Sequence, residues 1–372
     1  MRPPAHLPII ATRQCGAADQ LAAGPSGIPS RTRIASSSWG ARFPLGWRPT
    51  FPFWYRLAMA STTGHIWLNG RLLPAGEAHL SVYDRGFQLG DGVFEALRAK
   101  RGVSIELDGH LARLHASLAS LEFDLPFGDE VVAAGIAELL TVEGWDGIEP
   151  AGDAVVRVTV SRGYDPTRSV LPTFVGTASV VIQAWPFVPP PTRAVEEGER
   201  FITSCIRRDP SSPVSGIKST SRAELVYARL EASHAGADDA IFLTTDGRIA
   251  EATTANVLLI RGDECVTPRL GTGQLAGTTR AWFVDHGDAV GLRMVEGDIP
   301  LEAAFEADEM AICSSIAGVV PVTMLDGRPI GGGQPGPRTI AMRRAREEYI
   351  DRVSTEGSAA RVAQTLAARA GR

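Results

Sequence analysis

One lysine stands out in a sequence that otherwise uses arginine. Of the 37 lysine and arginine residues in this 372-residue chain, only Lys100 and Lys218 are lysines. Arginine stays protonated and cannot act as a nucleophile, whereas a lysine amine removed from water can lose its proton, attack a carbonyl and form a Schiff base. Lys218 lies two residues after Gly216 and just before the uncharged segment 219–221. It is a candidate for this chemistry, although a surface lysine kept by chance would look the same.

Other kinds of site have weak signals. Lys218 is not a phosphate-loop lysine, because no GxxxxGK[ST] motif precedes it, and the run Gly331–Gly333 has no nucleotide-binding context. His110 and His115 are five residues apart and do not form a metal pair on one helix face, so we expect surface or core histidines. The cysteines are scattered, without metal-ligand spacing, at Cys15, Cys205, Cys265 and Cys313. We predict no metal site.

Composition excludes some classes of protein. The net charge is −5, which argues against a nucleic-acid binder held by a general basic field. Apolar residues make up 44% of the chain and charged residues 21%, as in ordinary globular proteins. No apolar run is long enough to predict a transmembrane helix. We therefore expect neither a nucleic acid nor a membrane as a partner.

The first 58 residues differ from the rest. They contain seven arginines and one acidic residue, Asp19, so their formal charge is +6 and residues 59–372 carry the remaining −11 of the net −5. An arginine-rich, serine-rich, acid-poor start is typical of a transit peptide. Alternatively, translation begins at Met59. We expect this extension to be disordered and exclude it from the fold. The expected location is cytoplasmic, or organellar if residues 1–58 are a transit peptide.

Strands and helices alternate irregularly after residue 59. Turn dipeptides and β-branched residues predict hairpins or strands at 65–74, 93–107, 153–163, 177–187, 200–207, 309–316 and 318–330, and a β-meander at 239–268. Apolar spacing of three and four residues and helix boundary signals predict helices at 108–123, 129–143, 219–235, 274–289 and 337–351. This order predicts an α+β protein rather than a strict βαβ repeat.

Three consecutive prolines mark the expected domain boundary, because they can continue neither a helix nor a central strand. They lie in "FVPPPTR" (187–193). We predict a small α+β domain at 59–186, a proline-rich linker at 187–193 and a larger domain at 194–351. Residues 352–372 are expected to be a flexible tail.

Six segments resemble a known family. They occur in order as "YDRGFQLGDGVFEALRA" (83–99), "HLARLHAS" (110–117), "IKSTSRAELVYARLEA" (217–232), "IAEATTANVLLI" (249–260), "QLAGTTRAW" (274–282) and "DEMAICSSIAGVVPV" (308–322). Together they resemble the class-IV aminotransferases, the fold-type IV enzymes that use pyridoxal 5'-phosphate. That family includes branched-chain aminotransferases, D-amino-acid aminotransferases and aminodeoxychorismate lyases. The resemblance covers about 65–350, and it implies a small α+β domain, a larger barrel-like domain, a cofactor between them and a homodimer.

The resemblance implies a role for Lys218 and for the acidic residue that faces the cofactor ring. Lys218 matches the lysine that forms the Schiff base with the cofactor and later moves the α-proton. Glu251 matches the carboxylate that pairs with the pyridine nitrogen and keeps the ring protonated. Thr253, Thr254 and Asn256 follow in the same loop and are expected to shape the cofactor pocket.

The resemblance also implies where the phosphate binds. Arg113 matches the family's phosphate-binding arginine, and a phosphate favours a cation together with N–H and hydroxyl donors. Further donors are expected at Gly277, Thr278, Thr279, Ser314 and Ser315.

The substrate is the least determined part. Phe94 matches an aromatic residue that faces the substrate. Arg168 resembles the carboxylate-binding arginine of the D-amino-acid branch but is shifted by one position, and Arg222 resembles the lyase branch. No branch is matched cleanly. The main hypothesis is a transaminase acting on an amino acid, of branched-chain or D-amino-acid type, and a 2-oxo acid. The alternative is 4-amino-4-deoxychorismate lyase, which releases pyruvate and 4-aminobenzoate. A protein that only binds the cofactor is disfavoured because Lys218 and Glu251 are both present.

Overall fold

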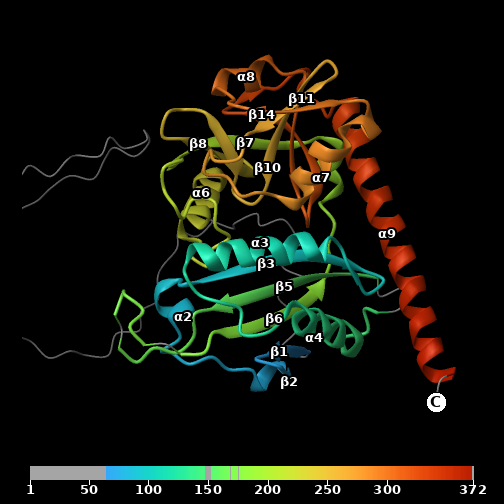
Figure 1. Ribbon diagram of the computed structural model, residues 1–372. Helices are drawn as coiled ribbons and strands as arrows, with labels where there is room; N and C mark the ends of the chain where they lie inside the picture. The colour runs from blue at the N-terminus through green and yellow to red at the C-terminus, as the bar shows by residue number, and fades with distance from the viewer. Residues whose placement is uncertain (1–63, 147–151, 168, 175, 371–372) are drawn as a thin grey trace, which may run out of the picture. The chain divides into compact units, whose positions relative to one another are not determined.

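A computed structural model describes residues 64–146, 152–167, 169–174 and 176–370, with side chains described as far as residue 359. The expectations for residues 1–58 lie outside this range. The described chain forms two β-sheets, one made by the first half and one by the second (Figure 1). No helix in the described part is long and apolar enough to cross a membrane.

The first sheet is antiparallel throughout, with the strand order β2-β1-β6-β5-β3-β4. Its strands are β1 (His65–Leu68), β2 (Arg71–Pro74), β3 (Gly92–Lys100), β4 (Val103–Ser104), β5 (Asp153–Ser161) and β6 (Ser179–Pro186). The turns between β1 and β2 and between β3 and β4 have positive φ at both central residues, as the tightest hairpins require. The φ angles are 49° and 85° at Asn69 and Gly70, and 49° and 70° at Arg101 and Gly102.

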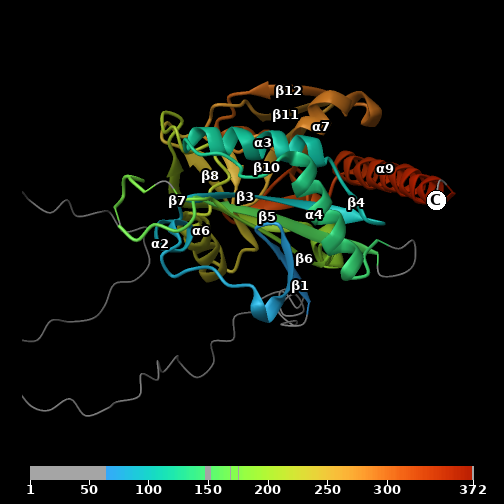
Figure 2. The same ribbon diagram turned by 60° about the horizontal axis from the view of Figure 1, so that its bottom comes forward.

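Helices cover one face of this sheet. Helix α3 (Leu107–Ser120) lies across β3, and α4 (Asp129–Val142) lies against β1 and β6 (Figure 1, Figure 2). The predicted leucine stripe of α3 packs into the core through Leu111, Leu114 and Leu118. The short helices η1 (Ala75–Glu77) and α2 (Arg85–Leu89) connect β2 to β3. The opposite face of the sheet carries Phe94, whose environment is described below.

The second sheet is mixed, with the order β12-β11-β10-β13-β14-β7-β8-β9 and β15 beside β14. Its strands are β7 (Glu199–Arg208), β8 (Asp239–Thr244), β9 (Ile249–Ala252), β10 (Asn256–Arg261), β11 (Glu264–Pro268), β12 (Arg293–Gly297), β13 (Glu309–Ser314), β14 (Gly318–Leu325) and β15 (Arg328–Pro329). β7 pairs in parallel with both β8 and β14.

The two edges of this sheet approach each other. β9 is at one end of the strand order and β12 is at the other. Nevertheless, the Ile249 amide donates to the carbonyl of Ile299, just after β12, at 2.8 Å, and Arg248 and Pro300 form an isolated bridge. The sheet therefore curls into a barrel-like form around an apolar core that includes Phe201, Ile241, Val257, Ile312 and Val320.

Helices surround the second sheet. They are α5 (Thr192–Glu196), α6 (Ala223–His234), α7 (Thr278–His286) with the following turn η2 (Gly287–Val290), α8 (Leu301–Glu306) and α9 (Pro337–Ala370). Apolar side chains of α6 pack on β8, and those of α7 and α9 pack on β10 and β13. α9 continues past the second sheet and also contacts β3 and β4 of the first (Figure 1).

The α+β fold class is confirmed, and most predicted strands and helices are present. Four boundaries differ from the prediction. The helix expected at 274–289 begins only at Thr278. The helix expected at 219–235 begins only at Ala223, because residues 218–220 pair with β3 instead. The meander at 239–268 is interrupted, since β10 pairs with β11 and β13 rather than with β9. Residues 352–370, expected to be a loose tail, continue α9 to Ala370.

Candidate active site

Lys218 lies where the second half of the chain pairs with the first. The Phe94 amide donates to the Lys218 carbonyl at 2.9 Å, and the Thr220 amide donates to the Gly92 carbonyl at 2.9 Å. Val93 and Ser219 form the bridge between these two bonds. The start of β3 therefore holds the lysine segment like a short additional strand, which fixes the backbone from which the amine extends.

The amine of Lys218 is shifted toward its neutral form. Burial lowers the pKa of Lys218 to about 8, from an ordinary value of 10.5, because the charged form loses its hydration. The positive charges of Arg113 and Arg222 lower it further, while Glu95 and Glu251 act in the opposite direction. A lysine with this pKa can lose its proton near neutral pH, as Schiff-base and proton-transfer chemistry require.

Phe94 is the centre of a cationic group of side chains. Arg157 of β5 lies over its ring, 3.8 Å from Cζ to the centroid. The Nζ of Lys218 is 5.1 Å from the same centroid, and the Cζ of Arg222 is 5.3 Å from it. Within the described residues, the Arg222 guanidinium has no hydrogen bond or ion pair, and that of Arg157 donates only to the Thr159 hydroxyl, at 3.0 Å. Burial lowers the pKa of both guanidinium groups. Cations left unpaired in a half-buried place attract an anionic ligand.

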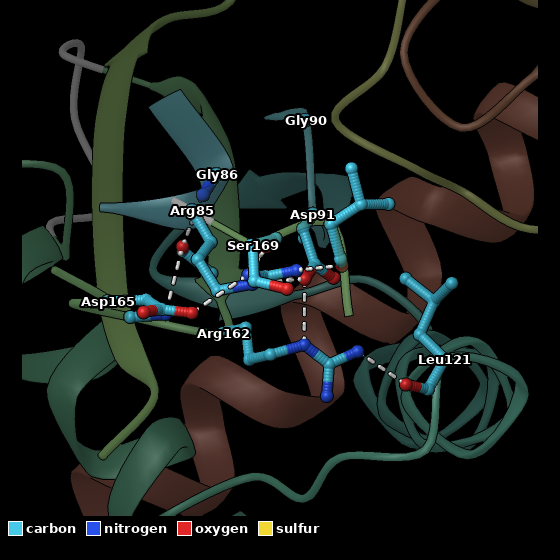
Figure 3. Close-up of polar contacts among 12 residues, drawn as sticks. Arg85, Gly86, Gly90, Asp91, Leu121, Arg162, Asp165 and Ser169 are labelled. Atoms are coloured by element: carbon cyan, nitrogen blue, oxygen red, sulfur yellow. Dashed lines mark hydrogen bonds and ion pairs between the residues drawn. The ribbon is translucent and has the colours of Figure 1, made fainter. Parts of the chain in front are cut away.

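A buried ion network surrounds Asp91, the residue just before β3 (Figure 3). Arg85 and Arg162 each donate through Nε to Oδ2 of Asp91, both at 2.7 Å. Arg85 also donates to Asp165 at 2.9 Å and to the Ser169 carbonyl at 2.7 Å. Burial alone would raise the pKa of Asp91, but the hydrogen bonds and charges of the two arginines outweigh it and lower that pKa. The charged network fixes the residue that precedes Gly92 at the start of β3.

Glu251 belongs to β9. Its Oε1 is 3.0 Å from Nη2 of Arg208, and its Oε2 accepts a hydrogen bond from the Leu275 amide at 3.1 Å. Burial raises the pKa of Glu251 above its ordinary value, and Arg208 offsets only part of this rise. The charge of Glu251 acts on both Lys218 and Arg222. The arginine and the amide favour the ionised form of this carboxylate, against the effect of burial.

The start of α7 is built by close packing. The side-chain amide of Asn256 donates to the Leu275 carbonyl at 2.9 Å. A Cβ on Gly277 would collide with Oδ1 of Asn256, so only glycine fits beside this asparagine. Gly277 is the N-cap of α7, and no side chain caps the helix. The first amides of α7 are therefore available to an anion, which the helix dipole also favours.

Hydroxyl groups gather at this helix start. The Thr278 hydroxyl is 2.9 Å from that of Ser315 and 3.4 Å from Nε2 of His110. Nδ1 of His110 is 2.7 Å from Oε2 of Glu95. Because burial lowers the pKa of His110, its ring is neutral, with the Nδ1 proton donated to Glu95 and Nε2 left as the acceptor. Glu95 thus orients His110, and His110 orients the Thr278 hydroxyl.

Arg113 completes this group from α3. It donates to both carboxylate oxygens of Glu95, at 2.8 and 2.6 Å, and to the Ala276 carbonyl at 2.7 Å. Burial would raise the pKa of Glu95, but the hydrogen bonds of Arg113 and His110 lower it to about 2. The five N–H donors of a guanidinium leave some for a further acceptor. We call Arg113, Gly277–Thr279 and Ser315 the phosphate cup, after the role that the sequence predicts for them.

The remaining predicted residues lie at or near this site in different ways. Thr279 is buried in the first turn of α7 and accepts from Arg346 at 3.4 Å. The Ser314 hydroxyl accepts from the Ala317 amide at 3.1 Å and thereby closes the β13–β14 turn. Thr254 is exposed, and Thr253 donates to Asp239 at 2.7 Å. Arg168 lies outside the described residues. The roles assigned to these residues from the sequence stay predictions.

Several side chains of the site were missed by the sequence reasoning. The sequence contains one indication of Arg157, because a lone arginine interrupts an apolar strand. His110 lies three residues before Arg113, which was predicted, and so shares a face of α3 with it. Arg208 has no local signal, because only the pairing of β7 with β8 and of β8 with β9 brings it near Glu251. Among the described residues, no cluster of histidine, cysteine and acidic side chains is suited to a metal ion.

Comparison with known proteins defines the class. The family model "Amino-transferase class IV" matches residues 92–325. A putative branched-chain-amino-acid aminotransferase of Methanocaldococcus jannaschii is 32% identical over 77% of this chain and 95% of its own length. The D-alanine aminotransferase of Bacillus licheniformis is 30% identical over 77% and 96%. The aminodeoxychorismate lyase of Bacillus subtilis is 30% identical over 74% and 92%.

Solved structures agree with this assignment. The branched-chain aminotransferase of the archaeon Thermoproteus uzoniensis, solved with norvaline, superposes with a TM-score of 0.69 at 27% identity, over 77% of this chain and 94% of that one. Another branched-chain amino acid aminotransferase, complexed with N-(5'-phosphopyridoxyl)-L-glutamate, superposes with a TM-score of 0.70 at 28% identity, over 77% and 93%.

The chain belongs to the class-IV aminotransferase family. It has the two-domain fold expected from the sequence, and the cofactor of the class is pyridoxal phosphate. The exact domain boundaries at 186 and 194 stay predictions.

The described residues fit this cofactor. The phosphate cup offers a cation, hydroxyls and uncapped helix amides, which suit a phosphate. Lys218 offers an amine with a lowered pKa, and Glu251 offers a buried carboxylate held in place by two partners. These are the three kinds of group that a phosphorylated pyridine aldehyde can engage.

Proposed function

We propose that this chain moves an amino group between an amino acid and a 2-oxo acid, with Lys218 as its proton carrier. The supporting observation is the half-buried Lys218, with a pKa of about 8, placed among the phosphate cup, Glu251 and two unpaired arginines. When bound, pyridoxal phosphate supplies an aldehyde and an electron-withdrawing ring, which makes the α-proton of an amino acid removable.

Residues of the chain perform the remaining roles in the proposed reaction. The phosphate cup binds and orients the cofactor. Glu251 favours the protonated pyridine nitrogen, since its carboxylate is kept in place by Arg208 and the Leu275 amide. The Lys218 amine would accept the α-proton of the amino acid and later give it up. Phe94 excludes water from one side of this amine.

Arg157 and Arg222 are the proposed anchors for substrate carboxylates. They lie beside Phe94 together with the Lys218 amine, and neither has a carboxylate partner within the described residues. Two cations suit a substrate with two carboxylates, such as glutamate or 2-oxoglutarate. A purely apolar amino acid would use only one of them.

The same pair of arginines keeps the lyase alternative open. Aminodeoxychorismate also carries two carboxylates, and both reactions begin with the same proton transfer. The transaminase is the better supported reading, because the family model and the relatives include aminotransferases of two kinds.

Substrate turnover distinguishes the two activities. The cofactor-loaded chain is offered L- and D-amino acids with 2-oxoglutarate, and separately aminodeoxychorismate. We expect glutamate from the first mixture. Pyruvate with 4-aminobenzoate from the second mixture, and no glutamate from the first, would replace the transaminase by the lyase.

Variants then test the anchors. Arg222→Met and Arg157→Met should each raise KM for a dicarboxylate substrate by about tenfold or more, because a charged hydrogen bond contributes about 1.5–3 kcal/mol. With a monocarboxylate substrate, one of the two variants should raise KM less. Arg261→Met is the control, since Arg261 is exposed at the far end of β10. Unchanged KM values in both variants would remove the arginines from substrate binding.

We also propose that the chain acts as a homodimer. Two touching segments, residues 80–89 and the described residues 164–167 and 169–174, present exposed apolar side chains, with Phe87 at 76% and Val170 at 81% exposed. Arg85 joins the segments through the Ser169 and Val170 carbonyls. A group of exposed apolar side chains such as this fits a second copy better than water.

Sedimentation tests this proposal. The intact chain should sediment as a dimer, and Phe87→Glu combined with Val170→Glu should yield a folded monomer. A wild-type chain that sediments as a monomer at micromolar concentration would refute the dimer.

A further inference from the structure

Arg346 is a buried cation that the chemistry described so far does not use. It lies on α9 and is 1% exposed, among the largest fully buried side chains of the described chain. Its Nη1 and Nη2 donate to the two carboxylate oxygens of Glu106, at 2.6 and 2.9 Å. Nη2 also approaches the Thr279 hydroxyl at 3.4 Å. A guanidinium that binds a carboxylate with two parallel bonds fixes its direction as well as its distance.

The two partners of Arg346 stand at two helix starts. Glu106 is the N-cap residue of α3, with a φ of 55°, and its carbonyl accepts from the His110 amide at 3.1 Å. Thr279 lies in the first turn of α7. α3 carries His110 and Arg113, and α7 carries Thr278. The helices that supply the phosphate cup are therefore joined by one side chain of a third helix.

Few other polar contacts hold these two helix starts together. α3 packs on the first sheet and α7 on the second. Among the described residues, their direct side-chain bonds are Arg113 to the Ala276 carbonyl at 2.7 Å and His110 to Thr278 at 3.4 Å. Both involve residues that must also serve the ligand. Arg346 itself lies outside the cup, and of its two partners, Glu106 and Thr279, only Thr279 belongs to the cup.

The pair of Arg346 and Glu106 also affects the charge beside the phosphate cup. The negative charge of Glu106 acts on His110, beside the hydroxyls of the cup. An unpaired carboxylate there would repel a phosphate. Since Arg346 engages both oxygens of Glu106, the charge behind the cup is balanced and the direction of the Glu106 side chain is fixed.

We propose that Arg346 is a positioning residue for the phosphate group of the cofactor: by binding Glu106 and Thr279 together, it sets the spacing of α3 and α7 at the cup. This inference rests on the proposed cofactor chemistry. It predicts that the loss of Arg346 weakens the recognition of the phosphate and leaves the recognition of the rest of the cofactor intact.

The test compares two aldehydes that differ only in the phosphate. Dissociation constants of pyridoxal phosphate and of pyridoxal are measured by absorbance titration of the cofactor-free full chain. Arg346→Lys keeps a charge beside Glu106 but cannot engage both carboxylate oxygens and Thr279 at once. We expect pyridoxal phosphate to bind at least about tenfold more weakly to this variant, with the binding of pyridoxal unchanged within about twofold.

A matched control and a double variant complete the design. Arg344→Met changes an exposed arginine of the same helix that pairs with Glu348 one turn away, and it should leave both constants unchanged. Arg346→Met combined with Glu106→Gln removes both charges, so that no unpaired buried carboxylate can unfold the chain. This double variant should also lose phosphate affinity selectively.

The comparison of the two aldehydes tests the phosphate cup and the role of Arg346 separately. If the wild type does not prefer pyridoxal phosphate to pyridoxal, the phosphate cup itself is wrong. In another outcome, the wild type shows the preference, and both Arg346 variants keep it or bind the two aldehydes more weakly by the same factor. Either result for the variants refutes the positioning role of Arg346 and leaves the cup valid.

Discussion

The proton affinity of Lys218 is set mainly by burial, and its nearest charges only adjust it. Arg113 and Arg222 on one side and Glu95 and Glu251 on the other act in opposite directions. The amine would therefore keep a low pKa if a single neighbour were changed. This is the property that a proton carrier needs when a substrate carboxylate enters between it and the arginines.

The titration of Lys218 can be observed directly, because the chain has only one other lysine. Reductive ¹³C-methylation of the cofactor-free chain should give two lysine signals besides that of the N-terminus, and Lys218→Arg identifies one of them. We expect that signal to titrate with a midpoint near 8, so that the amine is protonated below this pH and neutral above it. The signal of Lys100, paired with Asp351, is the internal reference. A midpoint near 10.5 would contradict the buried environment described for Lys218.

Some residues of the site could be predicted from the sequence and others could not. Lys218, Glu251 and Arg113 lie in segments whose local pattern resembles a family, so their roles can be assigned one by one. Arg157 could not be found in this way, because its place depends on the register of two strands. Phe94 pairs with Thr159, and Arg157 lies two residues away on the same face of β5. A one-residue slip would point Arg157 to the opposite face.

At the scale of elements, the start of α7 depends on a close packing that a helix propensity does not describe. The sequence predicts a helix from 274, but α7 begins only after Gly277, and the reason for glycine there is the side chain of Asn256, which comes from a strand. The same holds for α6. Its apolar pattern predicts a helix from 219, yet residues 218–220 pair with β3, because tertiary hydrogen bonds outweigh local preference there.

Gly277→Ala tests the packing at α7. The added Cβ would collide with Oδ1 of Asn256, which is buried and bonded to the Leu275 carbonyl through its amide nitrogen. We expect a loss of about 1–3 kcal/mol of unfolding free energy, typical of overpacking, and weaker binding of pyridoxal phosphate. Thermal unfolding and cofactor titration measure the two effects. Gly332→Ala is the control, since nothing lies within 4 Å of its added Cβ. Equal behaviour of the two variants would show that the α7 turn tolerates a side chain.

At the scale of the molecule, α9 holds the two sheets together. Arg98 of β3 donates to both oxygens of Glu347, at 2.9 and 2.8 Å, and Asp351 pairs with Lys100 and Arg101. Together with the pair of Arg346 and Glu106, these contacts tie the helix to the first sheet. The sequence could not indicate this role, because the partners of α9 lie about 240 residues earlier in the chain.

The far part of α9 should contribute stability but not cofactor affinity. Ser354 is fully buried and accepts from Arg101 at 2.8 Å, and Gly357 packs against Val103. Deleting residues 352–372 removes these contacts but keeps Arg346 and its bonds. We expect a lower midpoint of urea unfolding, equivalent to about 1–3 kcal/mol, and an unchanged preference for pyridoxal phosphate over pyridoxal. A truncated chain that loses this preference would show that the whole helix, and not Arg346, serves the site.

The late position of α9 has a consequence for how the protein is made. Glu106 leaves the ribosome early, but the guanidinium that balances it is encoded 240 residues further on. During synthesis, the start of α3 stays without its partner until Arg346 has emerged. Chains that fold in the order of their synthesis expose such unsatisfied surfaces in the meantime. We therefore expect the cofactor to be acquired only after α9 has been synthesised, and a product that ends before Arg346 to lack a working cup.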